Sequence, residues 1–154
     1  MATLGVGAPR VSADRRHRQP DRTLRWAAWA FAFGAIVHNA DHLRRGFSSV
    51  SPSLVAVGTL GSVISVAAIV LVLSGHRLGP LAAVSAGFPL AVGFIAVHWL
   101  PRWSALSDPF VEGHPSRLSI VASLLEIAGA LWLAVAGWLV LRRAGGLASA
   151  VRLR

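Results

Sequence analysis

The chain has 154 residues, of which 55% are hydrophobic and only 14% are charged, and its mean hydropathy is +0.62. This composition is too apolar for an ordinary soluble domain and predicts an integral membrane protein, with the lipid bilayer as its surroundings. The formal charge of +9 comes from arginines that flank apolar runs, which argues against a nucleic-acid partner. The absence of cysteine excludes disulfides, thiolate metal sites and cysteine catalysis.

The two ends of the chain are basic and contain few large apolar side chains. Residues 1–23 are rich in arginine, proline and polar residues, a composition that cannot bury a core. We therefore expect a disordered, cytoplasmic N-terminal tail and a second basic cytoplasmic tail over residues 142–154.

Four apolar runs lie between these tails, at about residues 24–43, 54–73, 80–100 and 117–141. Each is close to the ~20 residues that a helix needs to cross a bilayer. The sequence therefore predicts an all-α membrane protein, a four-transmembrane-helix bundle with up-down-up-down topology. If both termini are cytoplasmic, most arginines lie on the inner side, as the positive-inside rule requires of a protein in the cell (plasma) membrane.

Several ionisable side chains interrupt these runs. The first run ends with His38, Asp41 and His42, the third ends with His98, and the fourth contains Glu126. Such residues are costly in hydrocarbon, usually face the interior of a bundle, and mark a functional site. In the predicted topology all five fall in the outer half of the bundle.

Helical spacing supports an inward orientation for two of these residues. Steps of three and four residues join His38 and Glu126 to small side chains, which favour close helix packing. The two stripes are Ala27, Ala30 and Gly34 before His38, and Ala122, Ala130 and Ala134 around Glu126. Ser116 is expected to cap the fourth helix.

The spacing of His38 and His42 allows both imidazoles to bind one metal ion from a single helix. His98 and Glu126 are the candidates for the other ligands, and zinc or non-haem iron suits such a set. Asp41 is predicted to be a ligand or an acceptor that orients an imidazole, and Asp41 and Glu126 are the candidate catalytic groups. Position 39 is Asn, so the H-E-x-x-H pattern of metallopeptidases is absent.

Other interpretations of the same residues remain open. The histidines could hydrogen-bond to one another or to lipid headgroups, or His98 with His38 or His42 could ligate a b-type haem, with Arg44, Arg45 or Arg102 near its propionates. Trp99, Trp103 and Phe110 are expected to form an aromatic belt at the interface, in preference to a lid over a substrate.

Three functions are compatible with this pattern. The first is a metal-binding membrane protein, an oxidoreductase or hydrolase acting on a lipid-soluble substrate. The second is a small proton- or cation-coupled transporter or channel-like subunit, with Glu126 and the histidines as a relay. The third is an accessory subunit of a membrane complex, and a homo-oligomer is also compatible with the sequence.

The layout of these motifs resembles a known group of proteins. H-N-x-D-H at residues 38–42, H-W-L-P-R-W-S-x-x-S-D-P-F at residues 98–110 and Glu126 within the fourth run are similar to small uncharacterised integral membrane proteins of actinobacteria. The likeness covers about residues 24–141. It implies the four-span fold and no particular activity.

Overall fold

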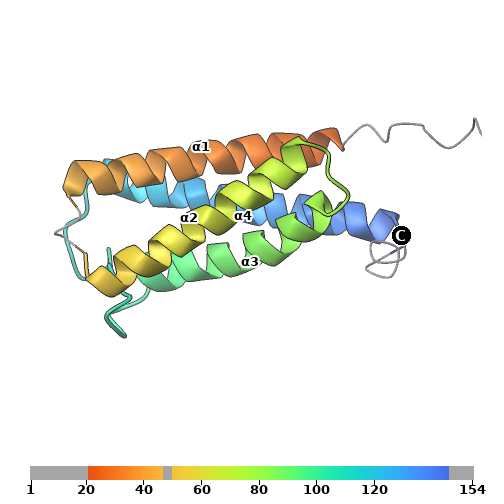
Figure 1. The fold of residues 1–154 in the computed structure, drawn as a ribbon. Coiled ribbons are helices and arrows are strands. Elements are labelled where there is room, and N and C mark those ends of the chain that lie inside the picture. Colours follow the sequence, from red (N-terminus) through yellow and green to blue (C-terminus); the bar gives the residue numbers. More distant parts are fainter. Residues whose placement is uncertain (1–20, 47–49, 146–154) are drawn as a thin grey trace, which may run out of the picture.

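The computed structural model describes residues 21–46 and 50–145, which form four α-helices lying side by side (Figure 1). These helices are α1 (Arg22–Arg45), α2 (Pro52–Leu73), α3 (Gly79–His98) and α4 (Arg117–Arg143). The tails predicted for residues 1–23 and 142–154 lie largely outside the described residues. Where they are described, Arg22, Thr23, Arg142 and Arg143 belong to helices.

Polar side chains fix where three of the helices begin. The carboxylate of Asp21 accepts a hydrogen bond from the backbone N–H of Leu24, which starts α1 two residues before the predicted span. Ser51 caps α2 in the same way. The predicted cap at Ser116 is confirmed, because its hydroxyl accepts from the N–H of Ser119.

Among the described residues, three helices are long and apolar enough to cross a membrane: α2, α3 and α4. The 24-residue α1 is long enough but less apolar, because its last two turns carry histidine, aspartate and arginine. Many large apolar side chains lie exposed on the outside of the bundle, Ile36, Leu60 and Val92 among them. A helical membrane protein with at least three candidate spans follows from these surfaces.

The core lies where α4 packs against α1 and α3, and small residues bring the helices close together. A Cβ added at Gly34 would lie 2.7 Å from the carbonyl oxygen of Leu125, and one at Gly129 would lie 2.7 Å from the Cα of Phe31. The predicted small-residue stripes are thus confirmed as packing surfaces, with Ala30 only half-buried. Helix α2 is packed less extensively than α4.

Candidate metal centre

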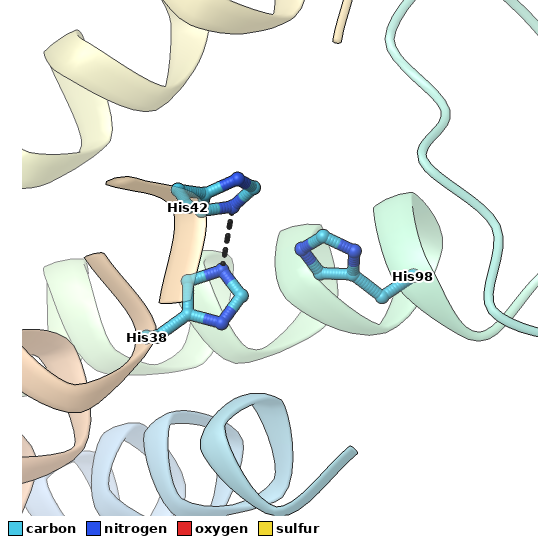
Figure 2. A group of neighbouring side chains, drawn as sticks. All are labelled: His38, His42 and His98. Atoms are coloured by element: carbon cyan, nitrogen blue, oxygen red, sulfur yellow. Dashed lines mark hydrogen bonds between the residues drawn. The ribbon is translucent and has the colours of Figure 1, made fainter. Parts of the chain in front are cut away.

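Three histidines meet at one end of the bundle, where α1 and α3 end and α4 begins. Figure 2 shows His38 and His42 extending from α1 toward His98, the last residue of α3. One ring nitrogen from each lies within 4.8 Å of the other two, and the Nε2 atoms of His38 and His42 are 3.0 Å apart. The structure therefore brings together the three imidazoles that the sequence predicted as metal ligands.

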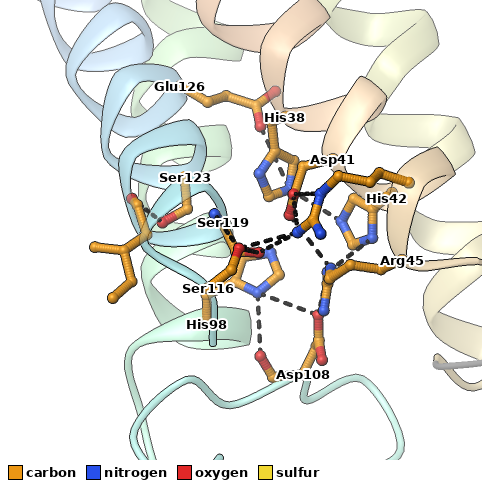
Figure 3. Close-up of polar contacts among 12 residues, drawn as sticks. His38, Asp41, His42, Arg45, His98, Asp108, Ser116, Ser119, Ser123 and Glu126 are labelled. Carbon is orange, nitrogen blue, oxygen red and sulfur yellow. Dashed lines mark hydrogen bonds and ion pairs between the residues drawn. The ribbon is translucent and has the colours of Figure 1, made fainter. Parts of the chain in front are cut away.

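Glu126 lies beside this group, on α4 (Figure 3). Its Oε2 atom lies 3.7 Å from Nε2 of His38, and the residue is only 3% exposed. Within the described part of the chain, neither Oε2 of Glu126 nor Nδ1 of His38 has a hydrogen-bond partner. Burying a polar atom without a partner is costly, so the carboxylate oxygen of Glu126 points to a proton, water or ion that the site would accept.

A hydrogen bond to the backbone assigns the tautomer of His98. Nδ1 of His98 lies 3.1 Å from the backbone carbonyl oxygen of Asp108, which can only accept. Nδ1 of His98 is therefore the protonated nitrogen, and in the neutral ring Nε2 keeps its lone pair. A ligand histidine is usually held in this way, by a hydrogen bond from its other nitrogen to a carbonyl.

Asp41 is held by arginine side chains. Its Oδ1 atom accepts from Nη2 of Arg44 at 2.7 Å, and its Oδ2 atom lies 3.3 Å from Nε of Arg45. The side chain of Asp41 is only 1% exposed. Arg44 also donates to the hydroxyls of Ser116 and Ser119, which ties the end of α1 to the start of α4. In these contacts Asp41 orients arginines rather than an imidazole, and its catalytic role stays a prediction.

Arg45 and Asp108 both contact the histidines, a role that the sequence analysis assigned to neither. Nη2 of Arg45 lies 3.0 Å from Nδ1 of His42 and 2.8 Å from Oδ2 of Asp108. Arg45 follows His42 by three residues and Asp41 by four, so helical spacing could have predicted the contact between Arg45 and His42. The contact between Arg45 and Asp108, 63 residues apart, has no such signal.

The loop after α3 folds back over the histidines. The backbone N–H of Phe110 donates to the carbonyl of His98, and the Phe110 ring stacks on the His98 ring with centroids 4.7 Å apart. Phe110 is therefore buried, and its predicted place in an interfacial aromatic belt is wrong. Trp103 is exposed, as a belt residue would be, and Trp99 is half-buried and lies 3.3 Å from the hydroxyl of Ser123 through its indole nitrogen.

An open pocket with a volume of about 360 Å³ lies beside the centre. Its walls come from the end of α1, the loop after α3 and the first turn of α4. Arg45, Asp108 and Phe110 line it and also contact the histidines. The pocket and the histidine cluster are therefore adjacent, and these three residues lie at their boundary.

The three imidazoles form a donor set that a metal ion could use. Three imidazole nitrogens and a carboxylate oxygen are ligands that suit zinc and non-haem iron. Ligand atoms on a tetrahedral zinc lie ~3.3 Å apart, given zinc–nitrogen distances near 2 Å. The His38–His42 pair is already near this spacing, and His98 needs only a small movement.

The chain was compared with known families, curated proteins and solved structures, and none of them matches it. The geometry of the site is therefore what indicates a function.

Proposed function

We propose that this chain is a four-span protein of the cell membrane that binds a divalent metal ion, zinc or non-haem iron, near its outer face. His38, His42, His98 and Glu126 are the ligands in this proposal. Helix α1 is the fourth span, the helices follow an up-down-up-down course, and both termini are cytoplasmic. The arginine distribution supports this orientation. The motifs at residues 38–42 and 98–110 support kinship with small four-span membrane proteins of actinobacteria.

One observation carries the metal assignment. Two helices place three imidazole nitrogens within 4.8 Å, and a third helix places a buried carboxylate oxygen without a partner 3.7 Å from one of them. A purely structural network would be expected to satisfy these buried polar atoms, because each unsatisfied one destabilises the fold. A bound metal ion would give the oxygen of Glu126 a partner and would use one lone pair of each imidazole.

The position of the centre indicates the class of substrate. The centre lies in a bundle whose outer surface is apolar, at the end where the adjacent pocket opens. A metal in such a site supplies Lewis-acid activation, or redox chemistry if it is iron. We infer that the substrate is lipid-soluble and that Glu126 and Asp41 position or exchange protons there.

The first experiment is metal analysis of the detergent-purified protein by elemental mass spectrometry, together with a visible absorption spectrum. We expect about one zinc or iron per chain in the wild type and none in the His38→Ala/His42→Ala variant. His76→Ala is the matched control, because His76 lies in the turn between α2 and α3 and bonds to the N–H of Leu78. It should keep its metal.

Two other outcomes would overturn the metal assignment. A haem spectrum lost with His98→Ala would replace the metal ion with a b-type haem. Equal absence of metal from the wild type and the double variant, after purification without chelators, would leave a hydrogen-bonded network instead.

A proton or cation transporter is the second candidate, and one feature favours it. Polar contacts run from the pocket through Arg45, His42 and His38 to Glu126. Beyond Glu126, however, the buried core contains apolar side chains such as Phe31 and Leu133. A relay across the membrane needs polar groups there, so we favour the metal centre. Proton flux in liposomes that Glu126→Gln abolishes would reverse this preference, and co-purification of a stoichiometric partner would favour an accessory subunit.

A further inference from the structure

Arg45 occupies the position between the pocket and the histidine cluster. Its side chain lines the pocket, is 19% exposed, and lies over the Phe110 ring at 5.8 Å. The same guanidinium contacts Nδ1 of His42 at 3.0 Å and Oδ2 of Asp108 at 2.8 Å. Arg45 therefore lies at the boundary between the pocket and the imidazoles, as do Asp108 and Phe110.

The contact with Arg45 determines which nitrogen of His42 carries the proton. A guanidinium can only donate, so Nδ1 of His42 must accept and has no hydrogen of its own. The proton of neutral His42 is then on Nε2, which lies 3.0 Å from Nε2 of His38 and donates to it. A nitrogen must be unprotonated to bind a metal, so Nε2 of His42 is blocked.

The other two histidines are not blocked in this way. His98 donates through Nδ1 to the carbonyl of Asp108, which leaves the lone pair of Nε2 free. His38 accepts at Nε2, so that nitrogen also carries a lone pair and faces the cluster. The contact from Arg45 to His42 therefore keeps one of the three nitrogens, Nε2 of His42, from acting as a ligand, while the other two are available.

We propose that Arg45 controls metal binding at this centre: a divalent cation reaches the histidines through the adjacent pocket only when Arg45 releases His42. This inference rests on the proposed function. When Arg45 leaves, the proton of His42 moves from Nε2 to Nδ1, and Nε2 becomes a ligand while the ring stays neutral. Arg45 is thus a positioning residue that acts through His42.

The surroundings of Arg45 make this release feasible. Arg45 is also paired with Asp41 at 3.3 Å and with Asp108 at 2.8 Å. It can give up the hydrogen bond to His42 and keep both carboxylate partners, so its charge stays compensated as it moves. Its partial exposure to the pocket leaves room for the movement.

The test compares Arg45→Met with Arg44→Met in metal-free protein, by titration with zinc and with cobalt(II). Both variants lose one positive charge that is paired with Asp41, but within the described residues Arg44 bonds to Asp41 and to serines and not to a histidine. We expect Arg45→Met to bind metal at least about tenfold more tightly and faster, and Arg44→Met to stay within about threefold of the wild type.

A second readout follows the tautomer itself. In the metal-free wild type, ¹⁵N NMR of His42 should show Nε2 protonated and Nδ1 bare. In Arg45→Met both tautomers should appear. This spectrum needs only the wild type, so it decides the question even if Arg45→Met does not fold.

The outcomes separate this inference from the proposed function. If the wild type binds metal and the two arginine variants change its affinity equally, charge alone explains the effect and the inference about Arg45 is wrong. A wild-type His42 protonated at Nδ1 would contradict it as well. If neither the wild type nor any variant binds metal, the proposed function fails, and control by Arg45 fails with it.

Discussion

The two ends of the bundle each carry aspartate–arginine ion pairs, but these pairs differ strongly in their exposure to water. At one end Asp21 pairs with Arg143 of α4 at 3.2 Å, and the arginine side chain is 70% exposed. At the other end Asp41 is buried and pairs with Arg44 and Arg45 beside the histidines. Exposed pairs add little to stability, whereas a buried charge must keep its partners. The comparison indicates that, of the two ion-paired aspartates, the one at the histidine end needs its arginine partners more.

Between the ends, close packing sets the distance from α1 to α4. Gly34 lies one turn before His38 and touches the backbone of Leu125 and Glu126. This contact holds His38 and Glu126 near each other, so the polar end depends on an apolar contact below it.

The largest effect is expected from Gly34→Ala. The new Cβ would lie 2.7 to 2.8 Å from backbone atoms of α4, which cannot move aside as a side chain could. We expect the free energy of unfolding to fall by about 3 kcal/mol. Zinc affinity should fall as well, because α1 and α4 separate. Reversible unfolding in mixed micelles measures the first effect.

Gly58→Ala in α2 is the matched control. A Cβ at Gly58 meets nothing within 4 Å, and alanine is the better helix former by about 1 kcal/mol. The control should be as stable as the wild type or more so. Equal losses in the two variants would mean that close approach of α1 to α4 does not position the centre.

Asp41→Asn should destabilise the protein by about 2 kcal/mol, because Arg44 and Arg45 lose their buried anionic partner. Arg45 would then depend on Asp108 for its charge compensation. Chemical unfolding measures the loss. An unchanged free energy of unfolding would mean that the buried pairs of Asp41 stabilise the protein no more than the exposed pair of Asp21 and Arg143.

Glu126→Leu should change stability and binding in opposite directions. The metal-free variant should gain about 1 kcal/mol, since a carboxylate oxygen without a partner leaves the core. Its zinc affinity should fall, because a ligand is lost. Glu126→Gln is the control and should lose affinity without the gain in stability. A destabilised Glu126→Leu would show that the carboxylate is satisfied in the metal-free protein.

The smallest effect is expected from Arg143→Gln at the opposite end. Its ion pair with Asp21 is exposed to water, so the free energy of unfolding should change by less than about 0.5 kcal/mol. Unfolding in the same micelles as Asp41→Asn gives the comparison directly. A loss as large as that of Asp41→Asn would mean that both ends depend on ion pairs.

Much of the fold could be predicted from the sequence, because helix length and small-residue spacing are local properties. The four helices, the cap at Ser116 and the small-residue face around Gly34 all follow from patterns within single helices. The meeting of His38 with His98 required only that two helix ends fall on the same side. Among the described helices, α1 is not one of the candidate spans, because its polar residues lower its mean hydropathy.

The details of the centre could not be predicted in the same way. Asp108 reaches Arg45 and His98 only because the loop after α3 folds back, through hydrogen bonds to the carbonyls of Val97 and His98. Phe110 is buried for the same reason, although its sequence context resembles an interfacial belt. Composition describes how much a loop prefers water or lipid, but not the direction in which its backbone turns.

The polar end of α1 also constrains how the chain is synthesised. In the proposed four-span arrangement, α1 leaves the ribosome first, yet Glu126, which lies beside His38, and Ser119, which bonds to Arg44, belong to α4, which leaves last. Until then α1 would have to hold an aspartate and two histidines in lipid with no partners beyond those on α1 itself, which is costly. We therefore expect α1 to rest at the membrane surface during translation and to insert fully only when α4 arrives, so a ribosome stalled before Arg117 would carry a chain whose first helix has not crossed.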